Sequence, residues 1–176
     1  MRLALFDHPG GVDAEGPNTV VLDLGADAAH LAPARVDGPA LRWTLGSDED
    51  GAQLAGEVEA GDGWLLRCDR VDFEPGGIAY RHVHPGGGIR RLLFGAIAIE
   101  SLGRTERHGP GDAWFERGPD PVLATTTDEE PSAFVRVMLV PVELAGRRTI
   151  RYVDPADADK PKTQRATVFL EEPVRP

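Results

Sequence analysis

The segment FEPGGIAYRHVHPGGGIRRLLFG, residues 73–95, decides how this chain is interpreted. It contains two apolar runs of strand length, and the sequences EPGG and HPGGG beside them are typical of tight turns. His82 and His84 lie two positions apart in the first run, so both imidazoles leave the same face of a strand. Two neutral nitrogen donors on one face can converge on a single metal ion.

Runs of the same kind continue on both sides of this segment. None sustains a period near 3.6 residues over a helical window, and Gly/Pro-rich sequences, including LGRTERHGPG at 102–111, separate them as turns. We expect at most one short helix, over 25–34, because Pro33 would end it. The predicted strands are LALF (3–6), TVVLDL (19–24), LRWTL (41–45), WLLRCDRVDF (64–73), IAYRHVH (78–84), RRLLFGAIAIES (90–101), DAWFE (112–116), PVLATTT (121–127) and SAFVRVMLVPVEL (132–144).

Short strands at this spacing predict an all-β fold, either an antiparallel barrel or a sandwich. We divide the chain into N-terminal strands at 1–63 that pack on the barrel, a barrel core at 64–145 and a C-terminal arm at 146–176. In the arm, TVFL at 167–170 could cover a sheet edge of this chain or of a neighbour. We expect a homodimer paired through TVVLDL or TVFL; the alternative is that both segments fold back on their own barrel.

The composition excludes several classes of protein. A length of 176 residues argues for one domain, and 29 acidic against 19 basic residues give a net charge of −10, which disfavours nucleic acid as a partner. There is no apolar run of about 18 residues, and MRLALFDHPGG turns polar too early for a signal peptide, so we expect a cytoplasmic protein without membrane contact. No phosphate-binding or dinucleotide-binding glycine motif is present, so no nucleotide cofactor is expected. Cys68 is predicted to be a buried structural thiol.

In these residues the chain resembles the cupin superfamily. The first cupin motif has a glycine, an H-x-H pair, a glutamate and a second glycine, and four of its positions are matched, by Gly76, His82, His84 and Gly95. Gly88 stands in the position of the glutamate. The second motif begins at Gly111 in GPGDAWFERGPDPV, but Val122 takes the position of its histidine. The resemblance covers roughly residues 64–142.

The resemblance implies a small antiparallel jelly-roll β-barrel with both histidines facing its mouth. Many cupins hold iron, manganese, nickel or zinc there with three histidines and a carboxylate. A divalent transition metal on His82 and His84 is therefore one expectation, with the missing ligands supplied by Glu116, by Asp120 or by water. The other expectation is a polar pocket in which the two histidines only form hydrogen bonds.

Arg90 is the second unusual feature of the segment. With a period of two, it shares its face with Gly88 and points where the glutamate of the motif would have pointed. Because Gly88 has no Cβ, a guanidinium in the adjoining space would favour a small molecule that carries a carboxylate or a phosphate. Alternatively, Arg90 pairs with Glu74, Glu116 or Asp120 inside the barrel, or a bulge turns it to solvent.

Two aromatic residues are further candidates for the lining of the pocket. Trp114 shares a face of DAWFE with Glu116 and could form the floor, although a core position is the more ordinary role of a tryptophan. Tyr80 has the parity of the two histidines, and a plain packing role is equally open for it. Asp120, in the turn beside Val122, is a candidate contact for substrate.

Three functions are compatible with this pattern. In the first, a metal-dependent enzyme (dioxygenase, isomerase or lyase) acts on a small anionic metabolite in the barrel mouth, and we place it ahead of the others. The second is a non-catalytic or sensory module that binds a small molecule. The third is a metal-free epimerase or isomerase in which a histidine moves a proton and Arg90 holds charge. One barrel hosts many activities, so the fold alone does not choose among them.

Overall fold

The computed structural model describes residues 1–46 and 50–175, and nearly all of its regular structure is β-strand. The elements are β1 (Arg2–His8), β2 (Val12–Ala14), β3 (Thr19–Asp23), β4 (Ala28–Leu31), β5 (Ala34–Val36), β6 (Ala40–Leu45), β7 (Leu54–Glu57), β8 (Trp64–Phe73), β9 (Ile78–Val83), β10 (Gly88–Phe94), β11 (Ile97–Ser101), β12 (Arg104–His108), β13 (Ala113–Glu116), β14 (Val122–Thr126), β15 (Ser132–Pro141), the 3-10 turn η1 (Val142–Leu144), β16 (Arg151–Tyr152), the 3-10 turn η2 (Pro155–Ala158) and β17 (Gln164–Pro173).

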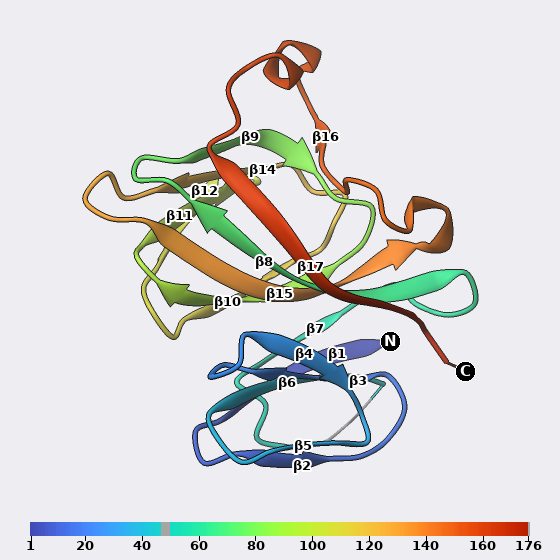
Figure 1. Cartoon of the computed structure of the whole chain (residues 1–176). Coiled ribbons are helices and arrows are strands. Elements are labelled where there is room, and N and C mark those ends of the chain that lie inside the picture. Colours follow the sequence, from blue (N-terminus) through green and yellow to red (C-terminus); the bar gives the residue numbers. More distant parts are fainter. Residues whose placement is uncertain (47–49, 176) are drawn as a thin grey trace.

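Strands β8 to β17 form the two facing sheets of a jelly roll (Figure 1). The central sheet has the order β13-β10-β15-β8-β17, and the distal sheet has the order β12-β11-β14-β9-β16. The chain passes from one sheet to the other at each step except the β11–β12 hairpin, and every pairing is antiparallel. This strand order is that of a jelly roll. The predicted all-β, antiparallel fold class is confirmed.

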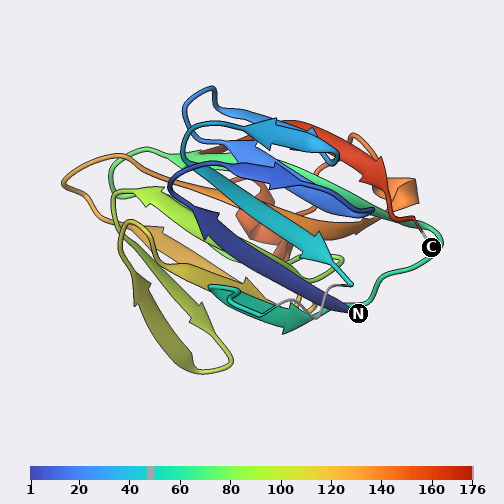
Figure 2. The ribbon, with the colours of Figure 1, turned by 90° about the horizontal axis from the view of Figure 1, so that it is seen from below.

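The N-terminal strands lie on the outer side of the central sheet (Figures 1 and 2). The N-terminal sheet has the order β4-β3-β6-β1-β7, and the two-stranded sheet β2-β5 lies beyond it. The molecule is therefore a stack in which the central sheet is covered on both faces. In such a sheet both sets of alternating side chains are buried.

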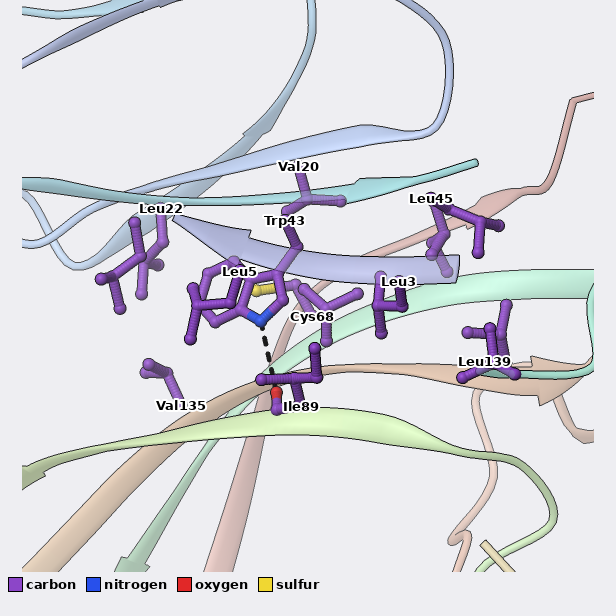
Figure 3. Close-up of a cluster of buried hydrophobic side chains, with 14 of the residues drawn as sticks. Leu3, Leu5, Val20, Leu22, Trp43, Leu45, Cys68, Ile89, Val135 and Leu139 are labelled. Atoms are coloured by element: carbon purple, nitrogen blue, oxygen red, sulfur yellow. Dashed lines mark hydrogen bonds between the residues drawn. The ribbon is translucent and has the colours of Figure 1, made fainter. Parts of the chain in front are cut away.

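A large apolar core fills the space between the N-terminal sheet and the central sheet (Figure 3). Trp43 of β6 is fully buried there, and its indole Nε1 donates a hydrogen bond to the carbonyl of Ile89 at 3.3 Å. Cys68 lies in the same core, which confirms its predicted structural role, and burial raises the pKa of its thiol well above the usual range. A second apolar core, which includes Val71 and Phe134, lies inside the jelly roll.

The segment 25–34, in which at most one short helix was expected, forms a turn and strand β4 instead. Asp23 ends β3, and its carboxylate accepts hydrogen bonds from the amides of Gly25 and Ala26 at 2.8 and 2.9 Å. This Asx-type turn, with Asp27 at φ +51°, reverses the chain into β4, which pairs with β3. The turn chemistry, rather than Pro33, decides the local structure.

The strand predicted over 90–101 forms two strands, β10 and β11. The segment 102–111, which was predicted as a turn, contains strand β12. Gly95 has φ +77°, and a Cβ on it would lie 2.1 Å from Ser132 Oγ, so only glycine fits where β10 ends and the chain turns into β11. A two-residue turn at Leu102 and Gly103 then leads into β12, whose residues 104–107 are exposed. An exposed polar strand lacks the apolar alternation on which strand prediction depends.

The C-terminal arm completes both jelly-roll sheets at one edge. TVFL lies in β17, which pairs with β8 of the same chain and so covers its edge. TVVLDL contains all of β3, which already has β4 and β6 as neighbours. It therefore has no open edge for a partner, and that part of the dimer prediction was wrong. No helix in the described part of the chain is long and apolar enough to cross a membrane.

Candidate binding site between the jelly-roll sheets

A cavity of about 440 Å³ lies between the central and distal sheets and opens toward the C-terminal arm. This volume is within the range of small-molecule sites. Its side chains divide into an apolar wall, a charged and histidine-containing wall, and an exposed basic margin. They come from β8, β9, β11, β13, β14, β15 and β17 and from residues 146–150 and 162.

His82 and His84 both face this cavity and both are buried, each 4% exposed. Their Nε2 atoms lie 3.2 Å apart, and the rings meet edge to face with centroids 4.8 Å apart. The predicted convergence of the two imidazoles is what the structure shows. On the second imidazole, Arg136 Nη1 also lies 3.2 Å from His84 Nε2.

The hydrogen bonds identify the tautomer of His82. Its Nδ1 lies 2.7 Å from the carbonyl oxygen of Tyr80, and a carbonyl only accepts, so Nδ1 carries the hydrogen. In a neutral His82, Nε2 then carries a lone pair and no hydrogen, in a residue that lines the cavity. His84 Nε2 can donate to this lone pair only if it carries a hydrogen, and it can accept from Arg136 only if it carries none. One of its two 3.2 Å contacts is therefore not a hydrogen bond.

Burial keeps both imidazoles neutral. Loss of hydration lowers the pKa of His82, and it lowers the pKa of His84 further, with help from the charges of Arg136 and Arg90. The backbone carbonyl of Tyr80 opposes the shift at His82. A neutral pair is the form that can accept a proton or bind a metal ion.

Arg136 is held against His84 by a buried carboxylate. Asp69 accepts hydrogen bonds from its Nε and Nη2 at 2.7 and 3.1 Å, and both residues are almost fully buried. They lie directly opposite one another on β15 and β8. Burial alone would lower the pKa of Arg136, but the attraction of Asp69 outweighs it and the pKa is raised. The guanidinium is therefore charged and fixed by a bidentate pair.

Arg90 is fully buried and pairs with Glu116, one of the alternatives considered from the sequence. Its Nη2 lies 2.7 Å from Glu116 Oε2 at an angle unsuited to a hydrogen bond, whereas Nη1 donates to the carbonyl of Gly88 at 2.6 Å. Burial lowers the pKa of Arg90 to about 10 against the attraction of Glu116, so the guanidinium remains charged at neutral pH. Trp114 Nε1 donates to the other carboxylate oxygen, Oε1, at 2.9 Å.

The two positions at which the sequence departs from the cupin motifs lie beside the histidines. Val122 of β14 pairs with His82 of β9 and lines the cavity, so an apolar side chain stands where the motif has its histidine. Gly88 pairs with Glu116 and Met138. A Cβ on Gly88 would lie 2.5 Å from the carbonyl oxygen of Val137, so the expected open space beside Gly88 is wrong and backbone fills it. The segments that resemble the two cupin motifs lie in the part of the chain that forms the jelly roll.

The chain has a cupin-like fold. Solved structures similar to it include the polyketide cyclase RemF from Streptomyces resistomycificus (23% identity, 55% of this chain and 75% of that chain, TM-score 0.41) and a cupin 2 domain-containing protein from Halorhodospira halophila (14%, 79% and 86%, 0.42). KdgF from Halomonas sp. is another (26%, 48% and 76%, 0.37). No family description and no curated protein matches the sequence.

The residues of the site do not fit a complete set of metal ligands. Within the described residues no group of three or more His, Cys, Asp or Glu side chains is arranged to hold a metal ion. Glu116 Oε2 lies 3.9 Å from His84 Nε2 and is engaged by Arg90. The guanidinium of Arg136 occupies the space beside His84 Nε2 in which a cation would have to lie.

Four residues predicted for the pocket do not line the cavity, namely Arg90, described above, and Tyr80, Trp114 and Asp120. A bulge in β9 places Ala79 and His82 against Ala124 and Val122, so the two residues between them on β9 lie opposite a single residue of β14. The bulge breaks the alternation, and Tyr80 lies instead beneath Lys160 Nζ, 4.5 Å from its ring centroid.

Trp114 and Asp120 line a second hollow, of about 630 Å³, at the opposite edge of the sheets. Trp114 is 4% exposed and belongs to the interior core, where its indole ring stacks on His108. Asp120 forms a surface ion pair with Arg117 at 2.8 Å. Glu116 contributes to the lining of both cavities.

Sequence reasoning missed three charged residues of the site, Arg67, Asp69 and Arg136. Arg67 is 3% exposed, and its Nη1 donates to the carbonyl of Arg147 at 2.9 Å while its guanidinium also pairs with Glu171. The signal was present, because WLLRCDRVDF carries charges on both of its faces, at Arg67 and Asp69 and at Arg70 and Asp72, and both faces cannot meet solvent in a central strand. The remaining interpretation of this strand was that one of its polar faces is buried inside the fold.

Proposed function

We propose that the cavity binds a small organic anion and that His82 accepts a proton from it. The observation that carries the proposal is that His82, which lines the cavity, has no hydrogen on Nε2, because its Nδ1 donates to the carbonyl of Tyr80. The balance of charge supports an anionic ligand, because six basic and two acidic side chains contribute to the lining.

The proton transfer uses groups that the fold holds in place. His82 Nε2 takes a proton from a carbon or an oxygen of the ligand, and Nδ1 keeps its hydrogen bond to Tyr80 as the ring becomes an imidazolium. The charge that develops on the ligand is stabilised at a distance by the positive charge of Arg136, which stays paired with Asp69. Reactions that begin in this way include isomerisations and eliminations.

One observation favours the metal-dependent alternative on His82, His84 and Glu116. Two nitrogens bound to one ion at about 2.1 Å, at a tetrahedral angle, lie about 3.4 Å apart. The Nε2 separation of 3.2 Å is close to that value. This second candidate requires Arg136 to leave His84 and Glu116 to leave Arg90.

Isothermal titration calorimetry on metal-free protein, after treatment with a chelator, tests the proposal. The panel contains pyruvate, benzoate, octanoate and glucose 6-phosphate. We expect at least one anion to bind, and wild-type protein but not His82→Phe to exchange carbon-bound hydrogen of that anion for deuterium from D2O, followed by NMR. Binding of no anion would contradict the proposal.

The same titrations, repeated after loading with Zn²⁺ or Mn²⁺, separate the candidates. Anion binding only to loaded protein, with stoichiometric metal that is lost in His82→Ala, would support the metal-dependent enzyme instead. Binding without exchange of ligand hydrogen for deuterium would leave a non-catalytic binding module.

A further inference from the structure

The cavity is divided into an apolar half and a polar half along the strands that build it. On β8, Asp69 faces the cavity at the polar end, and Val71 and Phe73 face it at the other end. On β15, Arg136 and Phe134 follow the same order. The distal sheet completes the apolar half with Ala79, Ile99, Val122 and Ala124. A ligand that fills the cavity therefore meets apolar surface over part of its length.

The buried arginines of the site are already compensated. Arg67 pairs with Glu171, Arg90 with Glu116 and Arg136 with Asp69. The Nε and Nη2 of Arg136 point to Asp69, and Nη1 lies at His84. An anionic group in the interior would have to displace a buried carboxylate, which leaves a charge without a partner at a cost of about 3–5 kcal/mol.

The basic residues at the cavity mouth have no such partners. Arg148 and Lys162 line the cavity, are exposed, and both lie against Tyr152 of β16. Arg148 Nη2 lies 3.2 Å from the Tyr152 hydroxyl, and Lys162 Nζ lies 4.6 Å from the centre of its ring. Lys162 also donates to the backbone carbonyl of Asp157 at 2.6 Å. Neither cation forms an ion pair with a carboxylate of the described residues.

The position of this pair relates it to the histidines. Tyr152 is the residue of β16 that pairs with His82 of β9, so the two cations stand at the mouth beside the proposed proton acceptor. An uncompensated cation pair, held by a tyrosine and a backbone carbonyl, is suited to a carboxylate or a phosphate. This pair of positive charges lies on a chain whose net charge is −10.

We propose that the ligand is an amphiphilic organic acid, whose anionic group binds to Arg148 and Lys162 at the mouth and whose apolar body lies against Val71, Phe73 and Phe134. The inference rests on the proposed function and adds the class and the orientation of the ligand. It moves the anion contact from Arg90, where the sequence placed it, to the C-terminal arm.

Calorimetric titration of the full chain with octanoate, octanol and acetate tests the inference. Octanoate carries both features, octanol lacks the charge and acetate lacks the apolar body. We expect octanoate to bind more tightly than either. Arg148→Ala with Lys162→Ala should weaken octanoate about tenfold and leave octanol unchanged. Arg104→Ala with Arg107→Ala, which removes the same charge from exposed β12, is the matched control and should change neither.

The apolar half is tested by Ala166→Trp. Ala166 is an exposed residue of β17 that lines the cavity, so a large side chain there can fill the space without entering a packed core. Octanoate and octanol should both lose affinity in this variant. Acetate binding as tightly as octanoate, or octanoate binding unaffected by loss of Arg148 and Lys162, would overturn the inference while the proposed function stands. If neither octanoate nor the other anions bind to wild-type protein, the proposed function itself fails.

Discussion

The central sheet has one face against the N-terminal sheet and one against the cavity, and the same strands supply both. On the first face Cys68, Ile89 and Val137 are fully buried in an apolar core. On the second face Asp69, Arg90 and Arg136 are buried to a similar degree. The first face is stabilised by loss of apolar surface from water, and the second depends on each charge having its partner. Burial alone therefore does not distinguish scaffold from site in this sheet.

The largest effect is expected on the apolar face. Trp43→Ala removes a fully buried indole and leaves the carbonyl of Ile89 without its side-chain donor. We expect a loss of about 4 kcal/mol in the free energy of unfolding, measured by urea denaturation. Leu102→Ala, at a residue that is 71% exposed, is the control. A loss below about 1 kcal/mol would mean that the N-terminal sheet does not stabilise the central sheet.

The charged face should respond to single and double changes in opposite ways. Asp69→Asn leaves Arg136 buried without a counter-ion and should cost about 3 kcal/mol of unfolding free energy. Asp69→Leu combined with Arg136→Met removes both charges and should recover most of that loss, while ligand binding does not return. Equal losses in the single and the double variant would show that the pair is not coupled.

Protonation of His84 should make the stability of the charged face depend on pH, in contrast to that of the apolar face. Burial lowers the pKa of His84 in the folded state below the usual value of about 6.5, so the unfolded chain binds the proton first as pH falls. The stability that depends on a neutral His84 is complete above pH 6.5 and declines below it, with a slope of up to about 1.4 kcal/mol per pH unit. His84→Asn should flatten the decline in urea midpoint between pH 6.5 and 5. An unchanged pH profile would contradict a neutral, buried His84.

The smallest effect is expected outside both faces. Leu102 and Gly103, at φ +49° and +76°, form the two-residue turn of the β11–β12 hairpin. Asparagine is favoured over leucine at the first position of such a turn. Leu102→Asn should therefore raise the unfolding free energy by about 0.5 kcal/mol and leave ligand affinity unchanged. A decrease in thermal midpoint would show that the turn tolerates leucine for another reason.

Much of the jelly roll could be predicted from local sequence. The bounds of β8 were predicted as found, because WLLRCDRVDF is a long run that ends at the turn EPGG. The paired imidazoles of His82 and His84 also followed from a period of two. These features depend on alternation within one strand, which the sequence carries directly.

The rest depends on contacts between strands. The bulge that turns Tyr80 away from the cavity arises in the pairing of β9 with β14, and nothing in IAYRHVH indicates it. The carboxylate that compensates Arg136 comes from β8, more than 60 residues earlier in the chain. Arg90 was placed correctly inside the barrel, but its pairing with Glu116 among three candidate carboxylates follows from register, which is set by tertiary structure.

Strand β17 has a consequence for the time course of folding. It joins β8 with Gln164 opposite Phe73, and β8 in turn pairs with β15, so the central sheet closes loops of many tens of residues. Non-local pairing of this kind places all-β domains among the slow folders, on a scale of milliseconds to seconds. The cavity wall that contains Ala166 exists only after β17 has docked. In a refolding experiment, the return of ligand binding should therefore lag behind the burial of Trp43.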